Sequence, residues 1–127
     1  MKTAFALALA TAAGIAIGGI AVEGIRAQAK PPVYLIENNA VKDADGYMKQ
    51  FLPLAAPTVK AHGGRVMAAG KGIAVEGLPP NNRVVIIRWD SLDQLMAWHN
   101  SADYQSARKI GDKYATFNSM AVEGMAQ

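Results

Sequence analysis

Few side chains in this chain of 127 residues have the type and spacing that catalytic or metal chemistry requires. The two histidines, His62 and His99, lie on different predicted elements, and neither has a second histidine at ligand spacing, so no metal site is predicted. Ser91 and Ser101 lack the Gly-x-Ser-x-Gly setting of a nucleophile and are better explained as helix caps. Cysteine is absent, which excludes disulfides, thiolate chemistry and cysteine metal sites. No cofactor is predicted.

A second group of candidates consists of aromatic, basic and polar side chains that could line a ligand site. Tyr47, Trp98 and Tyr104 can stack on a small ring, although packing in a core or an interface explains them more simply. His62 is predicted at the C-terminal end of a helix, where the partial negative charge favours imidazolium, and this structural role is preferred over that of a general base. The candidate ligand-binding residues are Arg88, Glu37, Asn38, His62, Tyr47, Trp98, Tyr104 and Arg108.

Composition and charge bound the class of protein. Slightly over half of the chain is apolar and 18% is charged, which is typical of a folded domain and not of a disordered tail. The length leaves room for one domain. The formal charge is +3, and the basic residues are scattered, with no run of Lys or Arg that alternates with aromatics. The sequence therefore predicts no nucleic-acid partner.

The first 29 residues have the composition of an export signal. Lys2 provides a short positive region, residues 3–22 carry no charge, and Ala27-Gln28-Ala29 has the small-x-small pattern of a cleavage site. The sequence therefore predicts a signal peptide over residues 1–29, cleaved after Ala29. Residues 30–127 are then a periplasmic or secreted domain without stable membrane insertion. The alternative is an uncleaved N-terminal membrane anchor, because about 20 uncharged residues could span a bilayer.

The mature chain carries local signals for the order strand, helix, strand, strand, helix, strand. Asp43 begins the first helix with cap chemistry, Pro53 and Pro57 kink it or delay its start, and residues 62–64 end it. Strands are expected at residues 33–36, 65–69, 83–89 and 116–122, with a strand extension or hairpin partner at 73–76, and helical segments are expected from Ser91 and from Ser101 to Tyr114. This order predicts an α+β domain of the ferredoxin-like split βαβ type, with an antiparallel sheet covered by helices on one face.

Four short segments, in their order and spacing, resemble the domain of unknown function 1330 family. They are Gly63-Gly64-Arg65, Ser91 to Trp98, Ser101 to Ala107 and Val122-Glu123-Gly124, and the resemblance covers about residues 33–124. It implies a ferredoxin-like fold of the dimeric α/β-barrel type, in which the open sheets of a homodimer pack face to face. It implies no established reaction. The family commonly carries an acidic residue after the third-strand apolar run, whereas this chain has Arg88, which puts any role of that acid in doubt.

Arg88 is a further candidate because it is a cation within an otherwise apolar strand. If the strands at 33–36 and 83–89 are parallel neighbours, aligning Val33 with Val84 places Glu37 beside Arg88, and a one-residue slip brings Asn38 alongside. Arg88 could then anchor a ligand carboxylate while Glu37 orients the guanidinium. The alternative is a cross-strand ion pair with no role in binding.

Two functions from different classes remain open. The first, favoured because no base–nucleophile constellation is visible, is a non-catalytic exported homodimer that binds a small, partly apolar ligand or a protein partner. The second is a cofactor-independent enzyme, isomerase-like or monooxygenase-like, that acts on a small organic acid. A paired ionisable couple buried in a closed pocket favours the enzyme, whereas a shallow open sheet favours binding.

Overall fold

The computed structural model of the chain describes residues 30–126. The predicted signal peptide, residues 1–29, lies outside the described residues. All described helices and strands belong to one compact unit, Pro32–Gly124. Within residues 30–126, no helix combines the length and the apolar character that crossing a membrane needs.

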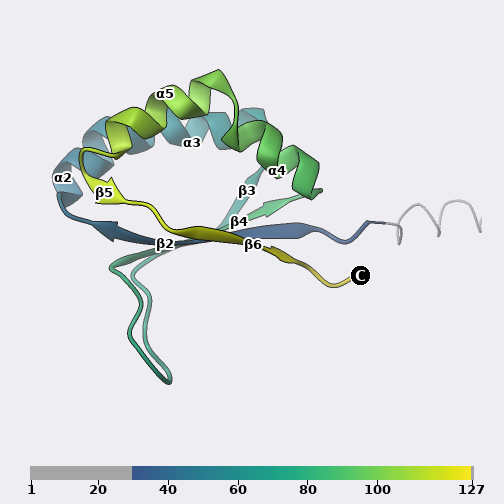
Figure 1. Cartoon of the computed structure of the whole chain (residues 1–127), viewed down its shortest axis with the longest axis horizontal. Helices are drawn as coiled ribbons and strands as arrows, with labels where there is room; N and C mark the ends of the chain where they lie inside the picture. The colour runs from purple at the N-terminus through teal and green to yellow at the C-terminus, as the bar shows by residue number, and fades with distance from the viewer. Residues whose placement is uncertain (1–29, 127) are drawn as a thin grey trace, which may run out of the picture. The chain divides into compact units, whose positions relative to one another are not determined.

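The unit is an antiparallel sheet with helices on one face, which confirms the predicted α+β class (Figure 1). The strand order is β3-β4-β2-β5, and β6 also pairs with β2. The elements in chain order are β2 (Val33–Val41), α2 (Ala44–Gly46), the π-helical segment η1 (Tyr47–Phe51), α3 (Leu52–Ala61), β3 (Arg65–Gly70), β4 (Arg83–Trp89), α4 (Leu92–His99), α5 (Ala102–Gly111), β5 (Ala115–Thr116) and β6 (Ser119–Glu123).

Short polar side chains begin the helices as the sequence predicts. Asp43 Oδ1 accepts a hydrogen bond from the Gly46 amide at 3.0 Å. The Ser91 hydroxyl accepts from the Gln94 amide at 3.1 Å, and Ser101 Oγ accepts from the Tyr104 amide at 3.3 Å. These bonds satisfy amides that have no partner within the first turn of a helix. Both serines are therefore helix caps.

The first helical region is irregular where the prolines crowd it. Its chain widens into the π-helical turn η1 before α3, Pro53 stands in the first turn of α3, and Pro57 lies inside that helix. A proline donates no amide bond and its ring pushes against the preceding turn, which accounts for the break in regular α geometry. Gly63 ends the region in the left-handed conformation with φ +89°, which favours glycine.

The first strand extends to Val41 instead of ending at residue 36, and the largest differences from the expected strands lie at residues 73–76 and 116–122. Residues 73–76 do not form a strand: β3 ends at Gly70, and residues 71–82 form an irregular arm that leaves the sheet on the side away from the helices (Figure 1). Within the described residues, no strand lies beside residues 73–76 to supply ladder bonds, so β propensity alone does not make them a strand. The expected last strand 116–122 is divided into β5 and β6. Between these strands, the Asn118 backbone bonds to residues 38 and 39 of β2.

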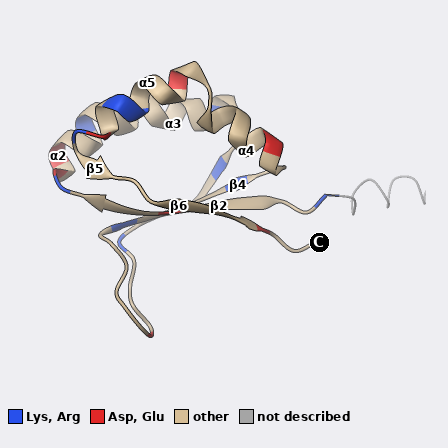
Figure 2. Ribbon diagram, in the orientation of Figure 1, with Lys and Arg blue, Asp and Glu red and all other residues tan. Residues whose placement is uncertain are grey.

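The core lies between the sheet and the helices. Leu35 of β2 and Ile87 and Trp89 of β4 are buried on the face that meets the helices, and the Trp89 ring centroid is 5.0 Å from that of Trp98 in α4. A side chain at Gly64 would bring its Cβ within 2.7 Å of the Trp89 ring. The close approach of the backbone to this ring explains the glycine at the start of β3. Basic and acidic residues are interspersed along the helices, and the strands carry few of them (Figure 2).

Candidate functional site

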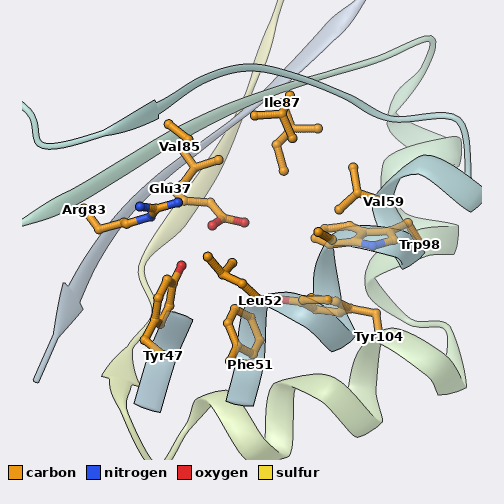
Figure 3. A pocket seen from close by; sticks show the side chains of 14 residues that line it. Glu37, Tyr47, Phe51, Leu52, Val59, Arg83, Val85, Ile87, Trp98 and Tyr104 are labelled. Atoms are coloured by element: carbon orange, nitrogen blue, oxygen red, sulfur yellow. The ribbon is translucent and has the colours of Figure 1, made fainter. Parts of the chain in front are cut away.

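A pocket of about 190 Å³ lies between the inner face of the sheet and the helices η1 and α3. Its walls are mainly apolar, and polar side chains gather around Glu37 in the close-up view (Figure 3). The apolar walls come from Phe51, Leu52, Ala55, Ala56, Val59, Val66, Ala69, Val85, Ile87 and Trp98, and the polar lining from Glu37, Tyr47, Arg83 and Tyr104. Such a cavity, apolar with a few convergent polar groups, is the usual form of a small-molecule site.

Glu37 points into this pocket because of its register in β2. Successive strand residues alternate between the two faces of a sheet, so Glu37 shares the inner face with Leu35, and its antiparallel partner is Val85 of β4. Figure 3 shows its carboxyl group directed into the cavity. Burial raises the pKa of Glu37 above its ordinary value, and the opposing effects are the hydrogen bond from Asn39 and the charges of Arg108 and Arg83.

Asn39 holds the Glu37 carboxyl in place. Its Nδ2 donates to Glu37 Oε1 at 3.0 Å, and its Oδ1 accepts from the Asn118 amide at 3.1 Å. The Asn39 side chain is completely buried. Because both ends of its amide are engaged, Asn39 fixes one carboxyl oxygen of Glu37. Asn39 is not among the candidates predicted from the sequence, although its spacing of two residues from Glu37 is the signal of a shared face.

Arg83 is the cation on the same face as Glu37. It pairs with Asn39 across the β2–β4 ladder, and alternation along β4 places it on the face of Val85 and Ile87. Its guanidinium carbon is 5.5 Å from the centroid of the Tyr47 ring. Its Nε is buried and has no hydrogen-bond partner. Arg83 is likewise absent from the candidates predicted from the sequence.

The two pocket tyrosines are neutral hydrogen-bonding groups over the physiological pH range. Burial raises the pKa of Tyr104 to about 12, with a smaller rise from the negative charge of Glu37. Burial likewise raises the pKa of Tyr47. The Tyr104 ring lies 4.1 Å from the Trp98 ring, and Trp98 Nε1 donates to Thr58 Oγ1 at 3.0 Å. Four of the candidates from sequence, Glu37, Tyr47, Trp98 and Tyr104, thus line one cavity.

The predicted pairing of Glu37 with Arg88 is wrong. β2 and β4 are antiparallel, so Arg88 pairs with Tyr34 and faces the opposite side of the sheet from Glu37. Its guanidinium lies 3.3 Å from the carboxylate of Asp90, outside the pocket. A hairpin returns β4 against β3, and β3 runs parallel to β2. β4, the third strand in the chain, therefore runs antiparallel to β2, the first strand.

Three further candidates lie away from the pocket lining. The Asn38 side chain accepts from the Asn81 amide at 2.8 Å and so holds the base of the arm. His62 lies at the C-terminal end of α3, where its Nδ1 is 2.9 Å from the Thr58 carbonyl oxygen. Arg108 forms an ion pair with Asp112 at 3.0 Å, and only its charge acts on Glu37. Among residues 30–126, no group of three or more His, Cys, Asp or Glu side chains could hold a metal ion.

The fold places this protein in the ferredoxin-like class, to which solved structures of similar fold belong. A protein of unknown function from Rhodopseudomonas palustris has a TM-score of 0.63 and 14% identity over 86% of this chain and 95% of its own. SnoaB, a cofactor-independent oxygenase from Streptomyces nogalater, has a TM-score of 0.57 and 11% identity over 76% and 96% of the two chains. A dimeric ferredoxin-like protein of unknown function from Bacteroides fragilis has a TM-score of 0.51 and 15% identity over 72% and 95%.

The family follows from the sequence itself. The model of the domain of unknown function 1330 family (DUF1330) matches residues 32–125, and the chain belongs to this family. The resemblance drawn from the four short segments is thereby confirmed. No curated protein matches the sequence. At identities of 11–15%, the similarity to the solved structures extends to the fold alone.

Proposed function

We propose that this protein is a cofactor-independent enzyme that transfers a proton on a small, mainly apolar ring compound, with Glu37 as the general base and acid. The observation that carries this proposal is a buried carboxyl group directed into an apolar pocket. A carboxyl whose pKa is raised by burial exchanges a proton more readily near neutral pH than an ordinary glutamate does. The sequence alone favoured binding without catalysis, and this carboxyl, with Arg83 and two tyrosines in the same pocket, shifts the preference to the enzyme.

The size of the pocket limits the substrate. An apolar cavity of about 150 Å³ accommodates benzene. The volume here is about 190 Å³, which suits one ring with a few substituent atoms. The ring would pack against the side chains of Leu52, Val59 and Trp98, and its reactive substituent would lie beside Glu37.

The reaction we propose is a proton transfer that returns the proton to the substrate. Glu37 takes a proton from an acidic C–H or O–H group, leaving an enolate or phenolate, and gives it back at another position of the same molecule. Asn39 fixes Oε1 of the carboxyl, so Oε2 is the oxygen that meets the substrate. The hydroxyls of Tyr47 and Tyr104 would donate to the developing oxyanion, which preorganised donors stabilise strongly in an apolar site. This step needs no oxidant and no cofactor.

The proposal is tested by deuterium exchange. The mature chain would be incubated in D₂O with a panel of single-ring carbon acids that includes phenylpyruvate and phenylacetone, and loss of the C–H signal followed by NMR. We expect exchange above background with at least one compound, and a decrease of about 10²- to 10⁴-fold in Glu37→Gln. Glu76→Gln, on the exposed arm, is the matched control and should exchange like wild type. Exchange at the background rate throughout, or equal exchange in Glu37→Gln, contradicts the proposal.

We further propose that the protein is a homodimer joined through the uncovered face of its sheet. This face carries apolar side chains from β2, β4 and β6, and Met120 and Val122 are 62% and 42% exposed. Exposed apolar area of this kind usually marks an interaction surface. The Bacteroides fragilis protein, which has the same fold, is described as dimeric. Light scattering should give the mass of two chains at micromolar concentration, and the mass of one chain rejects the dimer.

Export to the periplasm or the medium is the third part of the proposal, and it rests on the sequence of residues 1–29. Intact-mass analysis of protein from the cell envelope should show a chain that begins at Lys30. A full-length chain retained in the membrane would instead support the N-terminal anchor.

A further inference from the structure

We propose that the pocket selects ring compounds that carry a carboxylate, and that Arg83 is the residue that binds this group. The inference deepens the proposed function, because it names the substrate class of the same site. It rests on the position of a guanidinium that forms no salt bridge within residues 30–126 and lines a largely apolar cavity. It does not depend on whether Glu37 performs catalysis.

Arg83 differs from Arg88 of β4 and Arg108 of α5 in having no carboxylate within ion-pair distance among the described residues. Arg88 and Arg108 each have an aspartate within ion-pair distance, at 3.3 and 3.0 Å. Arg83 forms no ion pair with any residue in the described part of the chain, although it lines the pocket and is half-buried. Removing part of a cation from water without a salt bridge is costly, and a ligand carboxylate would offset that cost.

The hydrogen-bonding state of Arg83 points to the same ligand. Its Nε is buried without a partner, whereas most buried donors are satisfied. The guanidinium carbon lies 5.5 Å from the Tyr47 ring centroid. The Nε–H and a neighbouring Nη–H form an edge that a carboxylate can bind with both oxygens.

The surroundings of Arg83 allow a charged group to reach it. Arg83 and Tyr47 also line a second pocket of about 160 Å³, together with Met48 and Asn82. Arg83 therefore borders two cavities, so a charged group can approach its guanidinium from either one. In Figure 3 Arg83 and Tyr47 lie on one side of Glu37, and Trp98 and Val59 lie on the other. A ring acid would thus place its carboxylate at Arg83, its ring at Trp98 and the intervening carbon beside Glu37.

The test compares phenylacetate with phenylacetamide, which has nearly the same shape and no charge. Affinities for the mature wild-type protein, Arg83→Met and Arg88→Met would be measured by ligand-observed NMR or calorimetry. We expect wild type to bind the acid about 10- to 100-fold more tightly than the amide, as a charge-assisted hydrogen bond implies. In Arg83→Met this preference should disappear with the amide unaffected, and in Arg88→Met, altered on the opposite face, it should remain.

Arg83→Lys provides a second variant in case the methionine substitution prevents folding. It keeps the charge but loses the planar fork, so part of the preference should be lost. Equal affinity of wild type for acid and amide, no binding of either compound, or an unchanged preference in a folded Arg83 variant overturns the inference. The outcome is separable from that of the proposed function. An acid preference that depends on Arg83 without deuterium exchange leaves the carboxylate site standing and removes the enzyme.

Discussion

Replacing Thr58 tests whether a hydrogen bond fixes Trp98, which forms part of the pocket wall. Its buried hydroxyl accepts a hydrogen bond from Trp98 Nε1 at 3.0 Å and donates to the Ala55 carbonyl oxygen at 2.7 Å. The hydrogen bond between Trp98 and Thr58 joins α3 to α4 and fixes the indole ring that lines the pocket. Valine has nearly the shape of threonine but neither accepts nor donates, so Thr58→Val removes both bonds and adds no steric clash.

The expected cost follows from the buried indole N–H. Trp98 is 1% exposed, so water cannot replace the lost acceptor, and an unsatisfied buried donor costs about 1–3 kcal/mol. Thr58→Ser is the matched control because it keeps the hydroxyl and loses one methyl group, at a cost of about 1 kcal/mol. Packing and hydrogen bonding therefore make opposite predictions. If the hydrogen bond dominates, the valine variant is the less stable of the two, although it buries more apolar area.

Urea unfolding followed by tryptophan fluorescence measures this difference. The free energy of unfolding should fall by about 1–3 kcal/mol in Thr58→Val with an unchanged dependence on urea, which indicates that the folded state is otherwise intact. Affinity for phenylacetate should also fall, because the Trp98 ring is no longer fixed. A valine variant that equals or exceeds the stability of the serine variant would show that packing alone holds this wall.

Three other predictions concern the pocket and the arm. Burial raises the pKa of Glu37 above 4.5, so the folded state binds the proton more tightly than the unfolded state does. The contribution of Glu37 to the free energy of unfolding therefore falls as pH rises from 4.5 through the folded-state pKa. Glu37→Gln should remove that part of the pH dependence of urea unfolding, and identical curves for wild type and variant would contradict it. Ala55→Leu should fill the pocket and weaken the binding of phenylacetate at least about 10-fold. The free energy of unfolding should change by only about 1–2 kcal/mol, because the added carbons enter empty volume. Undiminished binding would place the ligand elsewhere. The arm leaves the sheet on the side of the face proposed for the dimer, and its Ile73 and Val75 are 86% and 97% exposed. Replacing both with serine should raise the dimer dissociation constant at least about 10-fold in sedimentation equilibrium and leave the fold intact. An unchanged constant excludes the arm from the interface.

Local features of the fold were predictable from the sequence, because each depends on a few neighbouring residues. Ser91 and Ser101 were predicted as caps from the spacing of polar side chains ahead of apolar ones, and the glycines at 63–64 marked the end of a helix. Residues 73–76 show the limit of the same reasoning. Their β propensity is high, but a strand needs a partner, and no strand lies beside the arm within the described residues.

The composition of the site depended on a longer-range feature, the direction and register of β2 against β4. Parallel alignment placed Glu37 beside Arg88, whereas the antiparallel ladder places Arg83 and Val85 on the face of Glu37. A change of one residue in register moves every side chain to the other face, so the sequence could nominate Glu37, Tyr47, Trp98 and Tyr104 but not assign the cation. The buried Asn39 was missed for a related reason. Its role depends on a contact with Asn118, which lies far along the chain.

The most direct test of the proposed chemistry is the titration of the Glu37 carboxyl itself. Protein comprising residues 30–127 would be labelled with ¹³C at the glutamate side-chain carboxyl, and the Glu37 signal assigned by its absence from Glu37→Gln. We predict that its midpoint in the folded, ligand-free protein lies above the ordinary value of 4.5, because burial disfavours the charged form. A midpoint at or below 4.5 would contradict the proposed role of Glu37, since this residue would then be no stronger a base than an ordinary glutamate.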